Sequence, residues 1–249
     1  MRAVLSIVAV LVWSSVVWGI VQAFQDPSYT VKIVEMDGFS EKSPVDAAQV
    51  RELAQVPTGE QNIFRIDLQK IENRILKNRW ISSAHLEKKP PQTLAVSVRF
   101  REPRAVFQNK DGQLAYVDAN GQVFGTLQSQ IGDLPMLSGM EQDSEKLRLG
   151  VALLSEWNKI GSLSGVKISS ISWDFERGYR LTVLYSTGSE TGRSALNLGK
   201  NPEFSTEDGK KQIQRISSVF RYLTQHQIQA RQIFAEVGKK IIVKIARRS

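Results

Sequence analysis

The chain has 249 residues, with 33 basic and 25 acidic side chains and a formal net charge of +8. It contains no cysteine, which excludes disulfide bonds and metal sites built from thiolates. A basic surface suits nucleic acid, anionic lipid or an acidic protein partner. The length suits two modest domains better than one.

Residues 3–24 contain no charged side chain, and they predict a transmembrane helix after a cytoplasmic tail of residues 1–2. As a helix they would extend about 33 Å, enough to cross the hydrocarbon core of a bilayer. Arg2 precedes this stretch and no basic residue follows it until Lys32, so the positive-inside rule places the N-terminus in the cytoplasm. The remainder is then expected outside the membrane, where a nucleic-acid partner is disfavoured.

A cleavable signal peptide is the alternative interpretation of the same stretch. Val21, Gln22 and Ala23 have the spacing expected for cleavage after Ala23. However, the apolar stretch exceeds the roughly 7–15 residues of a signal-peptide apolar region. We therefore expect a retained anchor, and both alternatives export the rest of the chain.

The first domain is predicted to follow the order strand, helix, helix, strand, strand. In the first strand we expect Val31 and Ile33 on one face and Val34 on the other. Pro44 suits the first turn of a helix, and Asp67 is expected to cap the second helix. The predicted elements are a strand at 31–37, helices at 43–57 and 67–79, and strands at 80–89 and 93–100. Such a sheet, backed by two helices, can bury one face.

The second domain is predicted to be rich in β-strands with two helices, which makes the chain an α+β protein. Asn109-Lys110-Asp111-Gly112 lies between two alternating segments and indicates a β-hairpin. The proline- and glycine-containing stretch 134–139 is expected to be a loop. The predicted elements are strands at 105–107, 114–117, 123–124, 166–173, 179–185, 193–198, 229–236 and 240–246, and helices at 144–160 and 206–225.

The sequence offers no set of catalytic or metal-binding residues. His85 falls in a predicted strand and His226 at a predicted helix end, and no nucleophile or carboxylate set accompanies either. Asp118-x-Asn120-Gly121 is similar to the start of a calcium loop but lacks the glutamate at the twelfth position, so a hairpin turn is the better interpretation. We therefore expect no enzymatic activity and no cofactor.

Several spaced motifs resemble the FtsQ/DivIB family of bacterial cell-division proteins. They are Asn62-Ile63-Phe64-x-Ile66-Asp67-Leu68, Trp80-Ile81-x-x-Ala84, Arg101-Glu102-Pro103-x-Ala105, Tyr116-Val117-Asp118-x-x-Gly121 and Leu134-Pro135-x-Leu137-x-Gly139. The first domain resembles a POTRA domain. Near the C-terminus the family's Asp-Leu-Arg-aromatic segment is replaced by Gln232-Ile233-Phe234, which keeps only the aromatic position.

The resemblance implies a POTRA domain at 31–101 and an FtsQ-type β domain at 104–249. It also implies a non-enzymatic, single-pass scaffold of the inner membrane at the division septum. The N-terminus would be cytoplasmic and the body periplasmic, so the protein would link division proteins on both sides. Its partners would be division proteins resembling FtsB and FtsL, with no nucleic acid and no small-molecule substrate.

The resemblance places partner binding in the C-terminal strand region. The residues concerned are Phe234, Glu236, Ile241, Ile242, Val243, Lys244 and Ile245. Residues 240–246 alternate, with Ile241, Val243 and Ile245 on one face, and the flanking lysines suit an edge strand. An ordinary core strand remains the alternative for each residue, because one face must pack inward.

Two functions of other classes remain open from the sequence. A POTRA-bearing export or outer-membrane assembly factor would need a following barrel or repeated POTRA domains, and neither is recognisable. A secreted cell-wall enzyme would need a polar triad or a metal-binding set, and no such set is recognisable. The division scaffold is therefore the favoured interpretation.

Overall fold

The computed structural model describes residues 2–127, 133–140, 143–160, 165–187, 190–200, 206–235 and 240–246, apart from the side chains of residues 2–10, Ile20 and Thr187. The chain divides into two compact units, residues 1–101 and 102–249. Each unit has its own hydrophobic core, and each is described by itself.

Helix α1 covers Arg2–Ala23 at the start of unit 1. Part of the predicted membrane span, namely the side chains of residues 3–10 and Ile20, lies outside the described residues. Across the described part of the chain, no helix is both long enough and apolar enough to cross a membrane. The end of α1 is tied to its unit by Asn62, whose amide Nδ2 donates a hydrogen bond to the Ala23 carbonyl oxygen over 2.9 Å.

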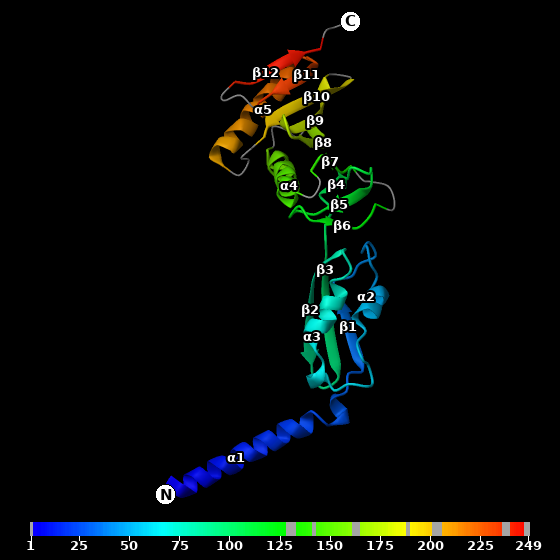
Figure 1. The fold of residues 1–249 in the computed structure, drawn as a ribbon, viewed down its shortest axis with the longest axis vertical. Helices are drawn as coiled ribbons and strands as arrows, with labels where there is room; N and C mark the ends of the chain where they lie inside the picture. The colour runs from blue at the N-terminus through cyan, green and yellow to red at the C-terminus, as the bar shows by residue number, and fades with distance from the viewer. Residues whose placement is uncertain are drawn as a thin grey trace. The chain divides into compact units, whose positions relative to one another are not determined.

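Unit 1 contains a three-stranded sheet with two packed helices (Figure 1). After α1 its elements are the 3-10 turn η1 (Pro27–Tyr29), β1 (Ile33–Asp37), α2 (Ala47–Ala54), the 3-10 turn η2 (Ile63–Arg65), α3 (Leu68–Ile75), β2 (Ile81–Lys89) and β3 (Thr93–Phe100). The spatial order is β1-β3-β2, with β1 parallel and β2 antiparallel to the central strand β3. The predicted order of strand, helix, helix, strand, strand is therefore confirmed.

The core of unit 1 follows from the alternation along β3 and the spacing along α3. Leu94 and Val96 are fully buried on one face of β3, and Ile71 and Ile75 of α3 join the same cluster. The predicted cap of α3 is present, because a carboxylate oxygen of Asp67 accepts the N–H of residue 70 over 3.2 Å. Capping satisfies one of the free N–H groups at a helix start.

Ile33 and Val34 lie on opposite faces of β1 as predicted, but Val31 does not share the exposed face of Ile33. Val34 is the buried residue of this strand, whereas the side chain of Ile33 is 52% exposed. Val31 is buried as predicted, but it precedes the strand, which begins at Ile33. The two-residue alternation of a strand therefore does not connect Val31 with Ile33.

Helix α2 begins later than predicted. Its N-cap is Asp46, whose carboxylate accepts the N–H of Gln49 over 2.7 Å. Pro44 lies before the helix, in a segment where Ser43 Oγ accepts the N–H of residue 40. The helix begins at Ala47, four residues after the predicted start, and its buried face is formed by Val50 and Ala54.

Unit 2 contains a nine-stranded mixed sheet and two helices (Figure 1). Its elements are β4 (Ala105–Gln108), β5 (Leu114–Val117), β6 (Val123–Phe124), β7 (Met136–Ser138), α4 (Ser144–Lys159), β8 (Val166–Asp174), β9 (Gly178–Thr187), β10 (Glu190–Gly199), α5 (Glu207–Gln225), β11 (Ala230–Phe234) and β12 (Ile242–Ile245). The spatial order is β12-β11-β10-β9-β8-β7-β4-β5-β6.

The two helices of unit 2 share the core of this sheet. The ring of Phe220 in α5 contacts Trp157 of α4 at 6.2 Å and Tyr185 of β9 at 5.3 Å between centroids. Helix α5 connects β10 to β11, which are parallel neighbours. Two parallel neighbouring strands need such a crossover, because the chain must return to the other end of the sheet before the second strand begins. The position of β11, and with it β12, therefore depends on α5.

The loop predicted at 134–139 is wrong for its central residues. Residues Met136–Ser138 form β7, which runs parallel to β4 on one side and to β8 on the other. The Leu137 side chain is fully buried. Three residues between a proline and a glycine carry little strand signal, so this strand is created by pairing with two distant neighbours rather than by local preference.

Candidate partner-binding edge

Strand β12 lies at one end of the sheet of unit 2, and no described strand lies beyond it. Among the described strands it pairs with β11 alone, in antiparallel orientation, so its other edge is open with respect to the described residues. The predicted strand region 240–246 is thus an edge strand. An open edge presents unpaired N–H and C=O groups that can pair with another chain.

Two backbone hydrogen bonds determine which backbone groups face the open edge. The N–H of Ala246 donates to the Gln229 carbonyl, and the N–H of Ala235 donates to the Asn197 carbonyl, each over 2.9 Å. Successive residues of a strand direct their backbone groups to opposite sides. The backbone groups of Ile242 and Lys244 therefore face β11, and those of Val243 and Ile245 face the open edge.

The side chains of the predicted site fall into two groups. Ile241 and Val243 are partly buried and pack against the core of unit 2. Ile242 and Ile245 are 53% and 62% exposed. The alternation predicts Ile245 on the same face as Ile241 and Val243, but its side chain is not buried with theirs. A bulge between Ala230 and residue 232 interrupts the pairing opposite Ile245, and bulges change the twist of a strand.

Phe234 and Lys244 come together across the β11–β12 pair. The Lys244 ammonium nitrogen lies 5.1 Å from the centroid of the half-buried Phe234 ring. Glu236, the remaining predicted site residue, lies outside the described residues. Exposed basic side chains of this edge are Arg231, Lys240 and Lys244, which favours an acidic partner segment.

The side chains that hold β11 in place were not among the residues predicted from the sequence. Tyr185, Ser194, Asn197 and Gln212 each form a hydrogen bond with a backbone group of β11 or of the residue that follows it. Part of this arrangement had a signal in the sequence, because Asn197 is a polar residue between Leu196 and Leu198 in the apolar second half of β10. Buried polar side chains are retained where their hydrogen bonds are satisfied.

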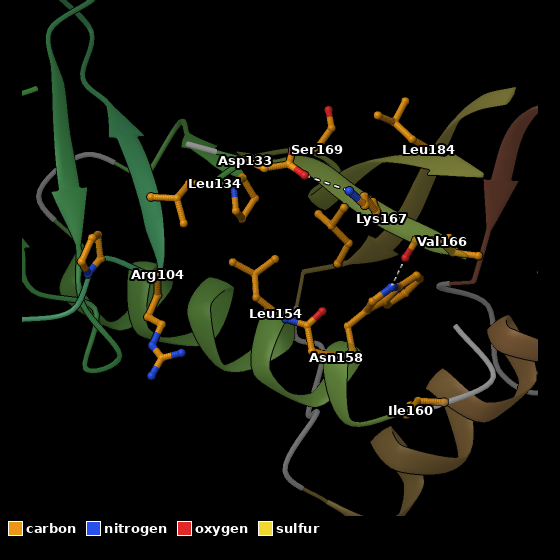
Figure 2. Close-up of a pocket in the computed structure, with 14 residues that line it drawn as sticks. Arg104, Asp133, Leu134, Leu154, Asn158, Ile160, Val166, Lys167, Ser169 and Leu184 are labelled. Carbon is orange, nitrogen blue, oxygen red and sulfur yellow. Dashed lines mark hydrogen bonds and ion pairs between the residues drawn. The ribbon is translucent and has the colours of Figure 1, made fainter. Parts of the chain in front are cut away.

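A cavity of about 480 Å³ lies elsewhere in unit 2, above α4 (Figure 2). Figure 2 shows Lys167 paired with Asp133 at its rim, and the Nζ–Oδ2 distance is 2.8 Å. The indole N–H of Trp157 donates to the Val166 carbonyl in its wall over 3.0 Å. The described lining shows no nucleophile hydrogen-bonded to a base, so the cavity offers no catalytic set.

The two histidines lie in different units and have no shared site. His85 is exposed on β2, and His226 caps the C-terminal end of α5 with its ring 4.2 Å from that of Tyr222. Within the described residues, no group of three histidine or carboxylate side chains could hold a metal ion. The open edge of β12 is therefore the feature with the clearest means of binding.

Comparison with known proteins identifies the family. A family model described as "POTRA domain, FtsQ-type" matches residues 30–99. A second model, described as "Cell division protein FtsQ/DivIB, C-terminal", matches residues 105–233, which is more than half of the chain. The chain belongs to the FtsQ/DivIB family of cell division proteins. The predicted resemblance is confirmed, and the β-α-α-β-β order of unit 1 is that of an FtsQ-type POTRA domain.

Curated FtsQ proteins match long stretches of this chain at low identity. Cell division protein FtsQ of Syntrophotalea carbinolica is 29% identical over 74% of this chain and 64% of its own length. FtsQ of Geotalea daltonii is 25% identical over 86% of this chain and 74% of its own length, and FtsQ of a Geobacter species is 28% identical over 80% and 71%. The match thus spans less than two thirds of the first of these relatives.

Membership of the FtsQ/DivIB family allows two conclusions about function. The family consists of non-enzymatic scaffold proteins of the division complex, so the expectation that the chain is not an enzyme is confirmed. Proteins of this family act at the division septum together with other proteins.

Proposed function

We propose that this chain is a single-pass inner-membrane scaffold that links cytoplasmic and periplasmic division proteins at the septum. In this proposal residues 3–24 anchor the chain, residues 1–2 stay in the cytoplasm, and a POTRA domain at 31–101 and a β domain at 104–249 lie outside. The absence of charged residues from 3–24 and the charge asymmetry around this stretch support that orientation.

The binding step of the scaffold is the addition of a partner strand to β12. The observation that carries this proposal is the pair of residues, Val243 and Ile245, whose backbone groups face the open edge. In strand addition, backbone hydrogen bonds provide affinity and alternate side chains provide specificity. The exposed side chains of Ile242 and Ile245 would supply apolar contacts. The partners proposed are division proteins resembling FtsB and FtsL.

Two proline substitutions test strand addition at this edge. Ile245→Pro removes an N–H that faces the open edge, so the hairpin should stay paired while partner co-purification is lost. Lys244→Pro removes an N–H that faces β11, so it should also unpair β12. Ile245→Val keeps both the N–H and an apolar side chain at this position, and it serves as the matched control. Undiminished partner binding by a folded Ile245→Pro protein would exclude strand addition at β12.

An N-terminal fluorescent fusion in dividing cells tests the anchor and the septal role together. A sharp band at midcell, with the full-length fusion in the membrane fraction, is the expected result. Uniform membrane fluorescence would contradict the septal role. A clipped or freely cytoplasmic tag would contradict the retained anchor and indicate a cleaved signal peptide.

A further inference from the structure

Strands β11 and β12 form a terminal hairpin that is joined to the rest of the sheet by little backbone pairing. Strand β11 pairs with β10 at Gln232, Ile233 and Phe234 only, whereas β9 pairs with β10 along almost its full length. Short strand pairs are only marginally stable by themselves in water. Other interactions must therefore hold the terminal hairpin at its place beside β10.

Two side chains bond to the first residue of β11. Ser194 Oγ in β10 donates to the Ala230 carbonyl over 2.5 Å, and the Ala230 N–H donates to the Tyr185 hydroxyl oxygen over 2.8 Å. Both bonds are buried. Tyr185 is itself fixed by its ring contact with Phe220 of α5. The start of β11 is thus connected to β9, β10 and α5.

The far end of β11 is held in the same manner. Asn197 Nδ2 donates to the Ile233 carbonyl over 3.4 Å, while its Oδ1 accepts the Nε–H of Arg180 over 3.2 Å. Gln212 of α5 donates from Nε2 to the Ala235 carbonyl. Asn197 alternates with Ser194 along β10, so the bonds reach β11 from both faces of the sheet.

These four side chains, Tyr185, Ser194, Asn197 and Gln212, form what we call the hairpin clamp. The bonds from the clamp to β11 and to Ala235 are all made to backbone groups, so the clamp positions β11 irrespective of the side chains that β11 carries. Asn197 and Ser194 are two of the four buried polar side chains in the described residues. Burying such groups is costly unless they are hydrogen-bonded, so their bonds to β11 specify its position.

We propose that the hairpin clamp is a positioning device for partner binding. It rests on the proposed function, because it holds the open edge of β12 in the geometry that accepts a partner strand. The clamp residues do not reach the open edge themselves, since β11 and β12 lie between them and it. Loss of one clamp bond therefore leaves the binding edge chemically intact but poorly ordered, and the partner must then order it on binding.

Asn197→Ala in the full chain tests the clamp. Hydrogen–deuterium exchange of the β11 and β12 amides should become faster, while exchange in β8, β9 and α4 stays as in wild type. The variant loses both the bond to the Ile233 carbonyl and the bond from Arg180 Nε. Because the first of these positions β11, affinity for the FtsB-type protein of the same organism should fall by about tenfold. Ser172→Ala, which removes a side-chain bond to the Arg180 carbonyl within β8 and β9, is the matched control and should change neither measurement.

An engineered disulfide between β10 and β11 tests whether Asn197→Ala weakens binding by releasing β11 or by lowering the stability of the whole domain. Ala195 and Gln232 are paired neighbours, both are half-buried, and neither belongs to the proposed partner contacts. Neighbouring strands lie about 4.8 Å apart, within the range for a disulfide, and the chain has no other cysteine. Ala195→Cys with Gln232→Cys should restore slow exchange and affinity to Asn197→Ala, and reduction should abolish the rescue.

The exchange and affinity measurements can fail separately, so a failure of the clamp can be told from a failure of the proposed function. Unchanged exchange in β11 and β12 of Asn197→Ala would overturn the clamp, even if wild type binds its partner. Faster exchange with undiminished affinity would overturn its role in positioning. If wild type shows no partner binding, the proposed function fails, and the exchange measurement and its rescue by the disulfide still decide whether the clamp holds the hairpin.

Discussion

The ammonium group of Lys244 lies 5.1 Å from the centroid of the Phe234 ring. The two residues are diagonal neighbours, because Lys244 pairs with Gln232 and Phe234 pairs with Ile242. A lysine over an aromatic ring at an exposed site contributes about 0.5–1 kcal/mol. Lys244 therefore stabilises the terminal hairpin in addition to charging its surface.

Replacing Lys244 tests this contact. Lys244→Met keeps much of the aliphatic stem but removes the charge, so the free energy of unfolding should fall by about 0.5–1 kcal/mol. Lys244→Arg keeps a cation over the ring and should behave like wild type. Denaturant titration of the three proteins measures the difference. Equal stability of the Met and Arg variants would show that the cation contributes nothing.

Gly38 follows β1 at a position where a side chain cannot fit. Its φ angle is +91°, and a Cβ placed there would overlap the carbonyl oxygen of Val98. Gly38→Ala should therefore destabilise the protein by more than about 2 kcal/mol. Gly59 also has a positive φ, +78°, but open space surrounds it, so Gly59→Ala should cost only about 1–2 kcal/mol. Calorimetry of both variants measures the two costs, and equal values would contradict the predicted overlap.

Trp157 has two roles in the core of unit 2, and they can be separated. Trp157→Phe keeps an aromatic ring near Phe220 but removes the indole N–H that bonds the Val166 carbonyl. We expect a loss of about 1–3 kcal/mol in the free energy of unfolding, since a buried acceptor loses its donor. Denaturant unfolding followed by circular dichroism measures this loss. A change below about 0.5 kcal/mol would mean that water in the cavity replaces the indole.

The N-cap of α4 makes one part of the stability depend on pH. Asp143 accepts hydrogen bonds from the ammonium and the backbone N–H of Lys146, and these bonds lower its pKa below the ordinary value of 3.8. A carboxyl whose pKa is lowered by folding stabilises the folded state above its unfolded pKa. That contribution is lost as the pH falls through the lowered, native value.

Asp143→Asn provides the measurement. Asparagine also caps helices well, so the variant should retain α4 but lose the bond to a charged carboxylate. Its unfolding free energy should depend less steeply on pH below 3.8 than that of wild type. Identical slopes in the two proteins would show that Asp143 does not contribute to acid sensitivity.

Elements with strong local signals could be predicted from the sequence. The alternation of Leu94, Val96 and Val98, the cap at Asp67 and the Asn109–Gly112 turn each specify their local structure without help from distant residues. Strand β7 could not be predicted, because its three residues become a strand only between β4 and β8. Val31 was assigned to the face of Ile33 because no local signal marks Ile33 as the first residue of β1.

The candidate site was predictable only in part. The apolar run with flanking lysines at 240–246 indicated an edge strand, and β12 is one. Which residues direct their backbone outward depends on the register with β11, and this register follows from the fold. The hairpin clamp depends on contacts between residues up to 45 positions apart in the chain, as between Tyr185 and Ala230. The local sequence could mark Asn197 as a polar residue among leucines, but it could not reveal which backbone groups the clamp residues bond.

The crossover through α5 has a consequence for synthesis. Strand β12 can form its edge only after β10, α5 and β11 have all emerged from the ribosome and come together. A nascent chain that stops within α5 would have the POTRA unit and most of the second sheet but would lack β12, the strand proposed to receive a partner. Recruitment of the partner would thus report that translation of the domain is complete, and unfinished chains would be left out of the division complex.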